Sequence, residues 1–148
     1  LPEYNFMHPS ISDDGKRLYF SSDCKGSTGG MDLFVCKRNT LVWETPVNLG
    51  PNINTNGNEV FPFIFADTIL YFSSDQRPGL GGLDVFTADY SKASETFFEP
   101  AKNCGDPFNS RFDDFGVFVL KEGNKGYLSS KRKNNTDEDL YFFIREIE

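Results

Sequence analysis

Short apolar runs bounded by Gly, Asp, Asn or Pro alternate with polar stretches along the whole chain. The runs are rich in Phe, Tyr, Ile and Val, as in Phe61-Pro62-Phe63-Ile64-Phe65, and this preference is typical of β-strands. Between two such runs, Asp13-Asp14-Gly15-Lys16 places a glycine where a tight hairpin turn needs a positive φ. The pattern therefore predicts an all-β chain of many short strands joined by turns.

One strand pattern recurs along the chain. The copies are Leu18-Tyr19-Phe20-Ser21-Ser22-Asp23, Leu70-Tyr71-Phe72-Ser73-Ser74-Asp75 and, more weakly, Gly126-Tyr127-Leu128-Ser129-Ser130-Lys131. After each copy, a loop leads to an acidic residue that begins the next expected strand: Asp32, Asp84 and Asp139. A second marker also repeats, since Asn48-Leu49-Gly50-Pro51 with Asn58-Glu59 matches Asn103-Cys104-Gly105-Asp106-Pro107 with Asp113-Asp114. A period of roughly 50 residues indicates an array of similar units.

Each unit has the pattern of four short antiparallel strands. In the first unit, the second strand is expected at 17–22, the third at 32–37 and an edge strand at 43–48; the second unit has its edge strand at about 97–102. Such units, repeated radially, are the blades of a β-propeller. We therefore predict one domain, 1–148, of three four-stranded antiparallel blades, with units at about 8–60, 61–114 and 115–148.

The third unit ends after its third strand, so the last predicted blade is incomplete. Propellers close with four to eight blades, and we therefore expect part of a larger ring of about six. The remaining blades would come from the same parent chain or from a second copy. A β-sandwich and a β-solenoid are the alternatives; three copies of a four-stranded unit argue against the first, and the long period argues against the second.

Composition and charge narrow the function. The net charge is −7, and no Lys or Arg cluster is dense enough to follow a phosphate backbone, so nucleic acid is not an expected partner. No apolar run approaches the roughly 20 residues that span a bilayer. The chain opens without Met, which predicts an internal or processed part of a longer protein. Three cysteines form neither a disulfide framework nor a zinc motif, although a Cys24–Cys36 bridge across a hairpin and free thiols both fit the sequence.

Motifs along nearly the whole chain resemble the TolB-like, WD40-like β-propeller repeats of Bacteroidetes. They include His8-Pro9-Ser10, Asp14-Gly15, Leu18-Tyr19-Phe20, Gly29-Gly30, Asn48-Leu49-Gly50, Ile53-Asn54-Thr55 and Phe61-Pro62-Phe63. Such repeats occur in OmpA-family peptidoglycan-associated proteins, including the PorE-like component of the type IX secretion system. The resemblance implies a periplasmic, outer-membrane-associated propeller whose partners are envelope or secretion-system proteins. It places no peptidoglycan-binding residue on this chain.

No convergent set of reactive residues is evident in the sequence. His8 is the single histidine, and no Gly-x-Ser-x-Gly elbow is present. The recurring Asp32, Asp84 and Asp139 are expected to form a ring about a propeller axis, each accepting hydrogen bonds from loop amides. We therefore expect a protein that is not an enzyme, with no catalytic, metal-binding or cofactor-binding residue and no cofactor.

The expected function is that of a protein-interaction or scaffold module. Binding residues are expected on loops held by the blades, and the long loops between second and third strands nominate Lys25, Thr28, Arg77, Leu80, Lys131 and Arg132. Asp67-Thr68-Ile69 resembles the motif at which Bacteroidetes attach O-glycans, so Thr68 is a candidate modification site. The alternative is a carbohydrate-binding or hydrolytic propeller, in which Trp43 or Phe112 stacks on sugars.

Overall fold

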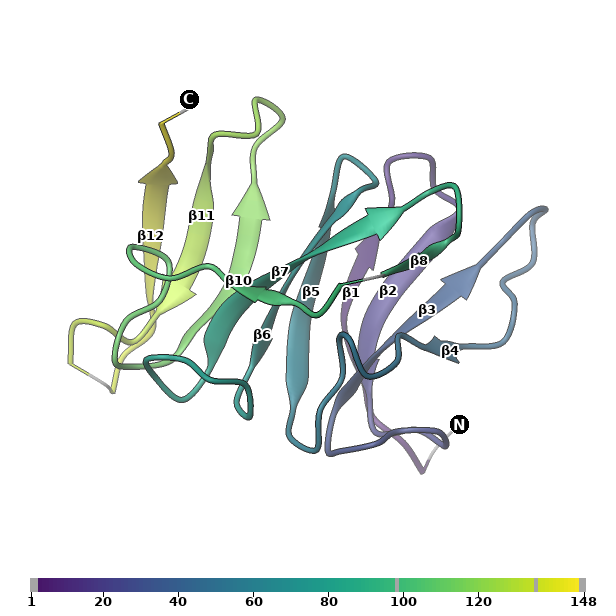
Figure 1. Cartoon of the computed structure of the whole chain (residues 1–148), viewed down its shortest axis with the longest axis horizontal. Helices are drawn as coiled ribbons and strands as arrows, with labels where there is room; N and C mark the ends of the chain where they lie inside the picture. The colour runs from purple at the N-terminus through teal and green to yellow at the C-terminus, as the bar shows by residue number, and fades with distance from the viewer. Residues whose placement is uncertain (1–2, 98, 135, 147–148) are drawn as a thin grey trace.

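The computed structural model describes residues 3–97, 99–134 and 136–146, and these form three antiparallel sheets without any helix (Figure 1). The first sheet contains β1 (Phe6–Ile11), β2 (Arg17–Ser22), β3 (Asp32–Lys37) and β4 (Val47–Asn48) in that order. The second contains β5 (Glu59–Phe65), β6 (Ile69–Ser74), β7 (Asp84–Ser91), β8 (Thr96–Phe97) and β9 (Lys102–Asn103), with β8 and β9 both paired to β7. The third contains β10 (Asp114–Val119), β11 (Lys125–Ser130) and β12 (Asp139–Ile144). The prediction of an all-β chain is confirmed.

The edge strands are shorter than the sequence pattern predicts. The strand expected at 43–48 is limited to β4, and the one expected at 97–102 is replaced by the two short strands β8 and β9. Proline explains the interruption, because Pro46 and Pro100 have no N–H to donate to a neighbouring strand. Residue 98, within the second predicted edge strand, lies outside the described residues.

The sequence repeat is a repeat of strand register. Ser22 pairs with Asp32, Ser74 with Asp84 and Ser130 with Asp139, so each copy of the strand motif meets its acidic partner in the same way. The first strands β1, β5 and β10 begin one or two residues before the predicted unit starts at 8, 61 and 115. The three sheets therefore share one local design.

Each first strand also contains a bulge at the same place. The register shifts between Met7 and Ser10 in β1, between Val60 and Phe63 in β5, and between Phe115 and Phe118 in β10. The bulged residues His8, Phe61 and Gly116 have φ angles of 54°, 53° and 63°. A positive φ is costly for His and Phe, so the surrounding sheets hold these residues in place.

The sheets pack face to face through alternating side chains. β5 lies between β1 and β10, so the bulged first strands of the three sheets are neighbours. In β2, Tyr19 faces the second sheet and Phe20 faces the opposite way, because successive side chains of a strand point to opposite faces. One buried cluster joins the first and second sheets, and another joins the second and third. A third cluster on the outer face of the first sheet includes Cys24 and Cys36, which are free thiols.

Candidate functional site

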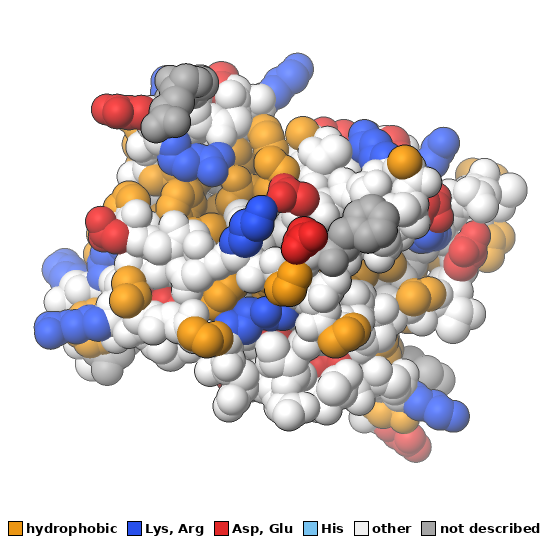
Figure 2. All heavy atoms as spheres, in the orientation of Figure 1, with side chains coloured by type: hydrophobic (Ala, Val, Ile, Leu, Met, Phe, Trp, Pro, Cys, Tyr) orange, Lys and Arg blue, Asp and Glu red, His pale blue; other side chains and the backbone are white. Residues whose placement is uncertain are grey.

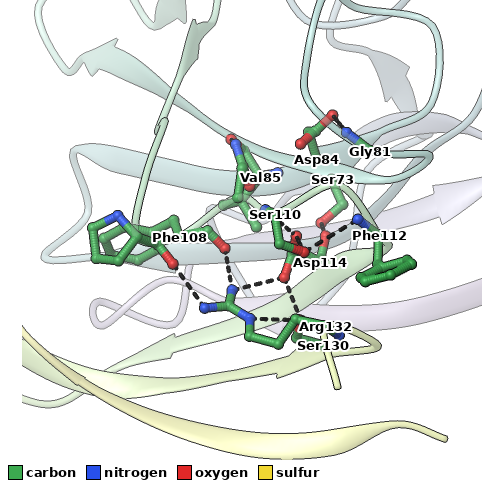
Figure 3. A network of polar contacts seen from close by, with 12 residues as sticks. Ser73, Gly81, Asp84, Val85, Phe108, Ser110, Phe112, Asp114, Ser130 and Arg132 are labelled. Carbon is green, nitrogen blue, oxygen red and sulfur yellow. Dashed lines mark hydrogen bonds and ion pairs between the residues drawn. The ribbon is translucent and has the colours of Figure 1, made fainter. Parts of the chain in front are cut away.

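A buried carboxylate anchors the seam between the second and third sheets (Figure 3). Asp114, at the start of β10, is fully buried and accepts hydrogen bonds from the backbone N–H of Ser110 at 2.6 Å and from its hydroxyl at 2.8 Å. The hydroxyl of Ser130 in β11 also donates to this carboxylate. Arg132 Nη2 lies 2.7 Å from the Asp114 carboxylate and completes the set of donors. The charge of Asp114 is thus both paired and hydrogen-bonded, as burial requires.

Arg132 extends this network into the segment that links the two sheets. Its Nη1 donates to the carbonyl oxygen of Pro107 at 2.9 Å, and its Nη2 donates to that of Phe108 at 2.7 Å. The Arg77 guanidinium does the same one sheet earlier, donating to the carbonyl oxygens of Asn52 and Ile53 at 2.8 and 2.9 Å. Both arginines therefore hold the connection between successive sheets.

Glu59 is the counterpart of Asp114 in the second sheet. It is fully buried and accepts hydrogen bonds from Thr55 N–H at 2.8 Å, from the Thr55 hydroxyl at 2.7 Å and from the Ser74 hydroxyl at 2.7 Å. The acid, the preceding Ser or Thr and the following Ser of the strand motif recur together. The recurrence of Glu59 and Asp114 is thereby explained by hydrogen bonding within the fold.

A pair of asparagine side chains connects each sheet to the next by hydrogen bonds. Asn54 bonds both backbone groups of Leu33, with its Oδ1 2.8 Å from the N–H nitrogen and its Nδ2 3.0 Å from the carbonyl oxygen. Asn109 bonds Val85 in the same way, at 2.7 and 2.9 Å. The marker asparagines Asn48 and Asn103 orient these side chains by accepting a bond from each at 2.8 Å. The second repeated marker of the sequence therefore includes residues that hydrogen-bond one sheet to the next.

The recurring aspartates close the loops that precede the third strands. Asp32 accepts hydrogen bonds from the N–H groups of Thr28 and Gly29, at 2.7 and 3.2 Å. Asp84 accepts one from Gly81 N–H at 3.0 Å, and burial raises the pKa of the Asp84 carboxyl. These contacts agree with the expectation for Asp32 and Asp84, and for Asp139 it stays a prediction. No group of three His, Cys, Asp or Glu side chains able to hold a metal ion is found among the described residues.

The residues nominated as partner-binding have different environments. Arg77 and Arg132 are engaged in the seams described above, and Lys131 Nζ lies 3.1 Å from the carboxylate of Asp113. Lys25, Thr28 and Leu80 are exposed on the loops. Loop length, the only sequence signal used, does not distinguish the two groups. Thr68 is half-buried in the β5–β6 hairpin and stays a candidate O-glycan site.

Asp113 also contacts the preceding sheet, and the residue at the equivalent place in the preceding unit suggests a substitution that tests this contact. Its carboxylate accepts a hydrogen bond from Leu83 N–H at 3.0 Å, and this bond holds the pKa of the carboxyl below its ordinary value. Asn58 is the counterpart, accepting from Met31 N–H at 3.0 Å. We expect Asp113→Asn to keep a neutral acceptor for Leu83 N–H and to lose the charge that strengthens this bond and pairs with Lys131, which costs about 0.5–1 kcal/mol at pH 7.

The expected loss depends on pH. Because the folded-state pKa of Asp113 is lowered, its stabilisation is present above the unfolded-state pKa of about 4 and is lost as pH falls through the folded-state value. Urea unfolding of Asp113→Asn and of the unmodified protein should therefore converge in acid. Glu99→Gln, at an exposed position, is the control for removing a charge. An equal difference at pH 7 and pH 3 would contradict this assignment.

A hollow of about 1,130 Å³ runs across the three bulged first strands. Its lining is mostly apolar and includes His8 and Ile11 of β1, Phe61 and Phe63 of β5 and Phe118 of β10. We call it the inner groove. It draws side chains from all three sheets, so it exists only because the sheets pack side by side.

Stacked rings form the floor of the inner groove. The ring centroids of His8 and Phe61 are 3.8 Å apart, and those of Phe61 and Phe115 are 4.9 Å apart. His8 Nδ1 accepts the N–H of Phe61 at 3.4 Å, and burial lowers the pKa of His8, which keeps the imidazole neutral at pH 7. At the third bulge, Gly116 has no ring. The groove therefore has an aromatic floor, and the charged residues Asp13 and Lys121 also line it.

Figure 2 shows hydrophobic side chains gathered over β10 and β11, while charged side chains are scattered over the rest of the visible face. No family model matches the chain, and the curated proteins contain no relative that matches it. The resemblance of the motifs to TolB-like repeats thus stays a prediction.

None of the described residues forms a helix of the length and apolarity needed to cross a membrane.

Proposed function

We propose that the three sheets are blades of a β-propeller that acts as a non-catalytic protein-interaction module, binding its partner through the inner groove. Three features support the propeller. The sheets repeat one strand order, each first strand carries a bulge at the same place, and the first strands lie next to one another. In a propeller, equivalent strands of successive blades line a common axis.

The third sheet supports further blades. On the first and second sheets, Tyr19, Leu33, Tyr71 and Val85 are buried by the sheet that follows. Their counterparts on the third sheet are Tyr127, which is 38% exposed, and Leu140, which is 69% exposed, with Phe142 beside them at 52%. An apolar sheet face of this kind is normally covered. The occupant that fits is a further unit of the same repeat, whose asparagine would hydrogen-bond the backbone N–H and carbonyl oxygen of Leu140.

The single observation that carries the binding function is the inner groove. It is wide, largely apolar and built on strands, and such surfaces bind aromatic and aliphatic side chains of a protein partner. The recurring Asp, Glu, Asn and Arg residues are used in seams and loops, so they act on the fold and leave the groove to its apolar side chains. From the motif resemblance, we place the protein in the periplasm, with an envelope or type IX secretion assembly as partner.

A photo-crosslinking phenylalanine analogue tests both parts in the protein within its native cells. Ile11 lines the groove, Phe142 lies on the bare face of the third sheet, and Leu41, 92% exposed, lies in neither. The analogue at position 11 should form an adduct with a second protein. At position 142 it should join a further unit of the repeat, and at position 41 it should form no specific adduct, as shown by mass spectrometry.

The experiment can contradict the propeller and the binding of a partner in the inner groove separately. A lack of protein adducts at position 11, with glycan binding by the purified protein, would favour the carbohydrate-binding alternative. Adducts at position 142 with unrelated proteins would contradict the propeller while leaving the groove intact. As a further control, Phe118→Glu should abolish the adduct at position 11, since Phe118 also lines the groove and is 52% exposed.

A further inference from the structure

A second hollow, of about 280 Å³, lies where the β1–β2 hairpin meets the end of β3 and the segment after β7. Its lining includes five basic residues: Lys16, Arg17, Lys37, Arg38 and Lys92. Only two acids, Asp14 and Glu95, share the lining. A chain with net charge −7 thus brings a third of its fifteen Lys and Arg residues to one small hollow. We call this hollow the basic pocket.

The second sheet is built without cations at the equivalent places. Arg17 pairs with Lys37 in register, and the counterpart pair one sheet later is Ile69 with Asp89. Similarly, Arg38 N–H bonds the carbonyl oxygen of Lys16, whereas Tyr90 N–H bonds that of Thr68. Neutral or acidic residues therefore occupy these places in the second sheet, whereas the third sheet has Lys125 at the place of Arg17 and Arg145 at the place of Arg38. Of the three described sheets, the first has cations at all four places, so the repeat alone does not account for this concentration of positive charge.

The acids present neutralise only part of this charge. Lys37 Nζ lies 2.6 Å from Glu95, while Arg17 and Lys92 lie 3.6 and 3.4 Å from the Asp67 carboxylate behind the pocket. Arg17 also lies 3.9 Å from Asp14. Within the described part of the chain, neither Lys16 nor Arg38 forms an ion pair; Arg38 Nε donates to the Gly15 carbonyl oxygen. Like charges held this close repel one another, and an anion would relieve that repulsion.

Buried polar groups point to the same ligand chemistry. Arg17 is only 7% exposed, and its guanidinium lies over the ring of Tyr90, 4.6 Å from the centroid. A neighbouring hollow of about 260 Å³ shares Arg17 and Lys37 with the basic pocket and is also lined by Tyr19. The hydroxyl of Tyr19 is buried and interacts with the Arg17 guanidinium. A buried hydroxyl beside a guanidinium is a donor that an anionic oxygen can satisfy.

We propose that the basic pocket binds an oxyanion, the carboxylate, sulfate or phosphate group of a small ligand. Arg17 supplies a fixed planar donor, and Lys16, Lys37, Arg38 and Lys92 supply flexible charges around it. The pocket is separate from the inner groove, with no lining residue in common. This inference therefore stands apart from the proposed binding of a protein partner.

The test is an NMR titration at low ionic strength with inorganic phosphate and, separately, with acetate. Phosphate should shift the amide signals of 14–17, 37–39 and 92–95 in a saturable way, and added chloride should weaken the effect by screening. Lys16→Thr and Arg38→Tyr copy the second sheet, and each should weaken binding by about three- to tenfold. Lys121→Thr, at an exposed position outside the pocket, is the matched control.

The two probes distinguish the sources of the group. Saturable shifts with phosphate alone indicate a phosphorylated or sulfated ligand, and saturable shifts with acetate as well indicate that a carboxylate also fits. Since Lys16 is exposed and its replacement already occurs in the repeat, the Lys16→Thr protein should retain its dispersed spectrum. Non-saturable shifts with both probes, or equal affinity for the Lys16→Thr and Lys121→Thr proteins, would overturn the proposal.

Discussion

Replacing Asp114 with alanine is expected to lower the free energy of unfolding by about 3–5 kcal/mol. The substitution leaves the Ser110 N–H and the Ser110 and Ser130 hydroxyls without their acceptor. It also leaves the Arg132 guanidinium in the seam without its counter-ion. Removing one partner of a buried pair costs more than the pair contributes, because the remaining charge stays away from water. Urea unfolding at pH 7 measures the difference.

The equivalent substitution in the second sheet is the matched comparison. Glu59→Ala removes a carboxylate that accepts bonds from Thr55 and Ser74, but Arg77 donates to carbonyl oxygens and forms no ion pair with Glu59 in the described structure. We therefore expect a smaller loss of about 1–3 kcal/mol. In the Asp114→Ala background, adding Arg132→Met should cost less than it does alone, because no unpaired cation is left. Equal losses for Glu59→Ala and Asp114→Ala would contradict the role given to Arg132.

Much of the fold could be predicted because the chain repeats. The recurrence of Leu18–Asp23 at Leu70–Asp75 identified the central strand of each sheet, and the acid after each loop identified the next strand. Register follows from the same residues, since a Ser of the motif pairs with that acid in every sheet. Repetition carries this information because a residue type that packing requires at one position is required again at the same position of every unit.

The functional surfaces were harder to predict for a physical reason. Loop length nominated Arg77 and Arg132 as partner-binding residues but gave no sign that nearby carbonyl oxygens accept hydrogen bonds from their guanidinium groups. The basic pocket was missed because Lys16, Lys37 and Lys92 are far apart in sequence and come together only through strand register and sheet packing. A comparison of aligned repeats, searching for charges that break the pattern, could have found it.

The weak third copy of the strand motif has a structural explanation. In the first two sheets, Leu18 pairs with Cys36 and Leu70 pairs with Ala88, so a large residue faces a small one. In the third sheet the sizes are exchanged, since Gly126 pairs with Phe143. A Cβ atom at Gly126 would lie 2.5 Å from Phe143 Cζ and 2.2 Å from the Phe118 carbonyl oxygen. Phe143 therefore fills the space that leucine fills elsewhere, as aromatic residues do beside strand glycines.

This exchange predicts a strong coupling between the two positions. Gly126→Leu should lower the free energy of unfolding by about 3 kcal/mol through overpacking, and Phe143→Ala should lower it by about 3–5 kcal/mol by leaving a cavity. The double variant recreates the Leu70–Ala88 pair of the second sheet, so its loss should fall short of the sum by about 1–3 kcal/mol. Denaturant unfolding of the four proteins measures the coupling.

The neighbouring residue provides the control for this cycle. Phe142 points to the bare face of the third sheet, so Phe142→Ala creates no space next to Gly126 and should not rescue Gly126→Leu. Additive losses for Gly126→Leu and Phe143→Ala would show that the backbone clash with the Phe118 carbonyl dominates. In that event, the distance between strands in the third sheet differs from that in the other two, and backbone geometry explains why Gly126 replaces the leucine of the other units. Rescue by Phe143→Ala would instead show that the three sheets share one backbone and differ only in which strand supplies the large side chain.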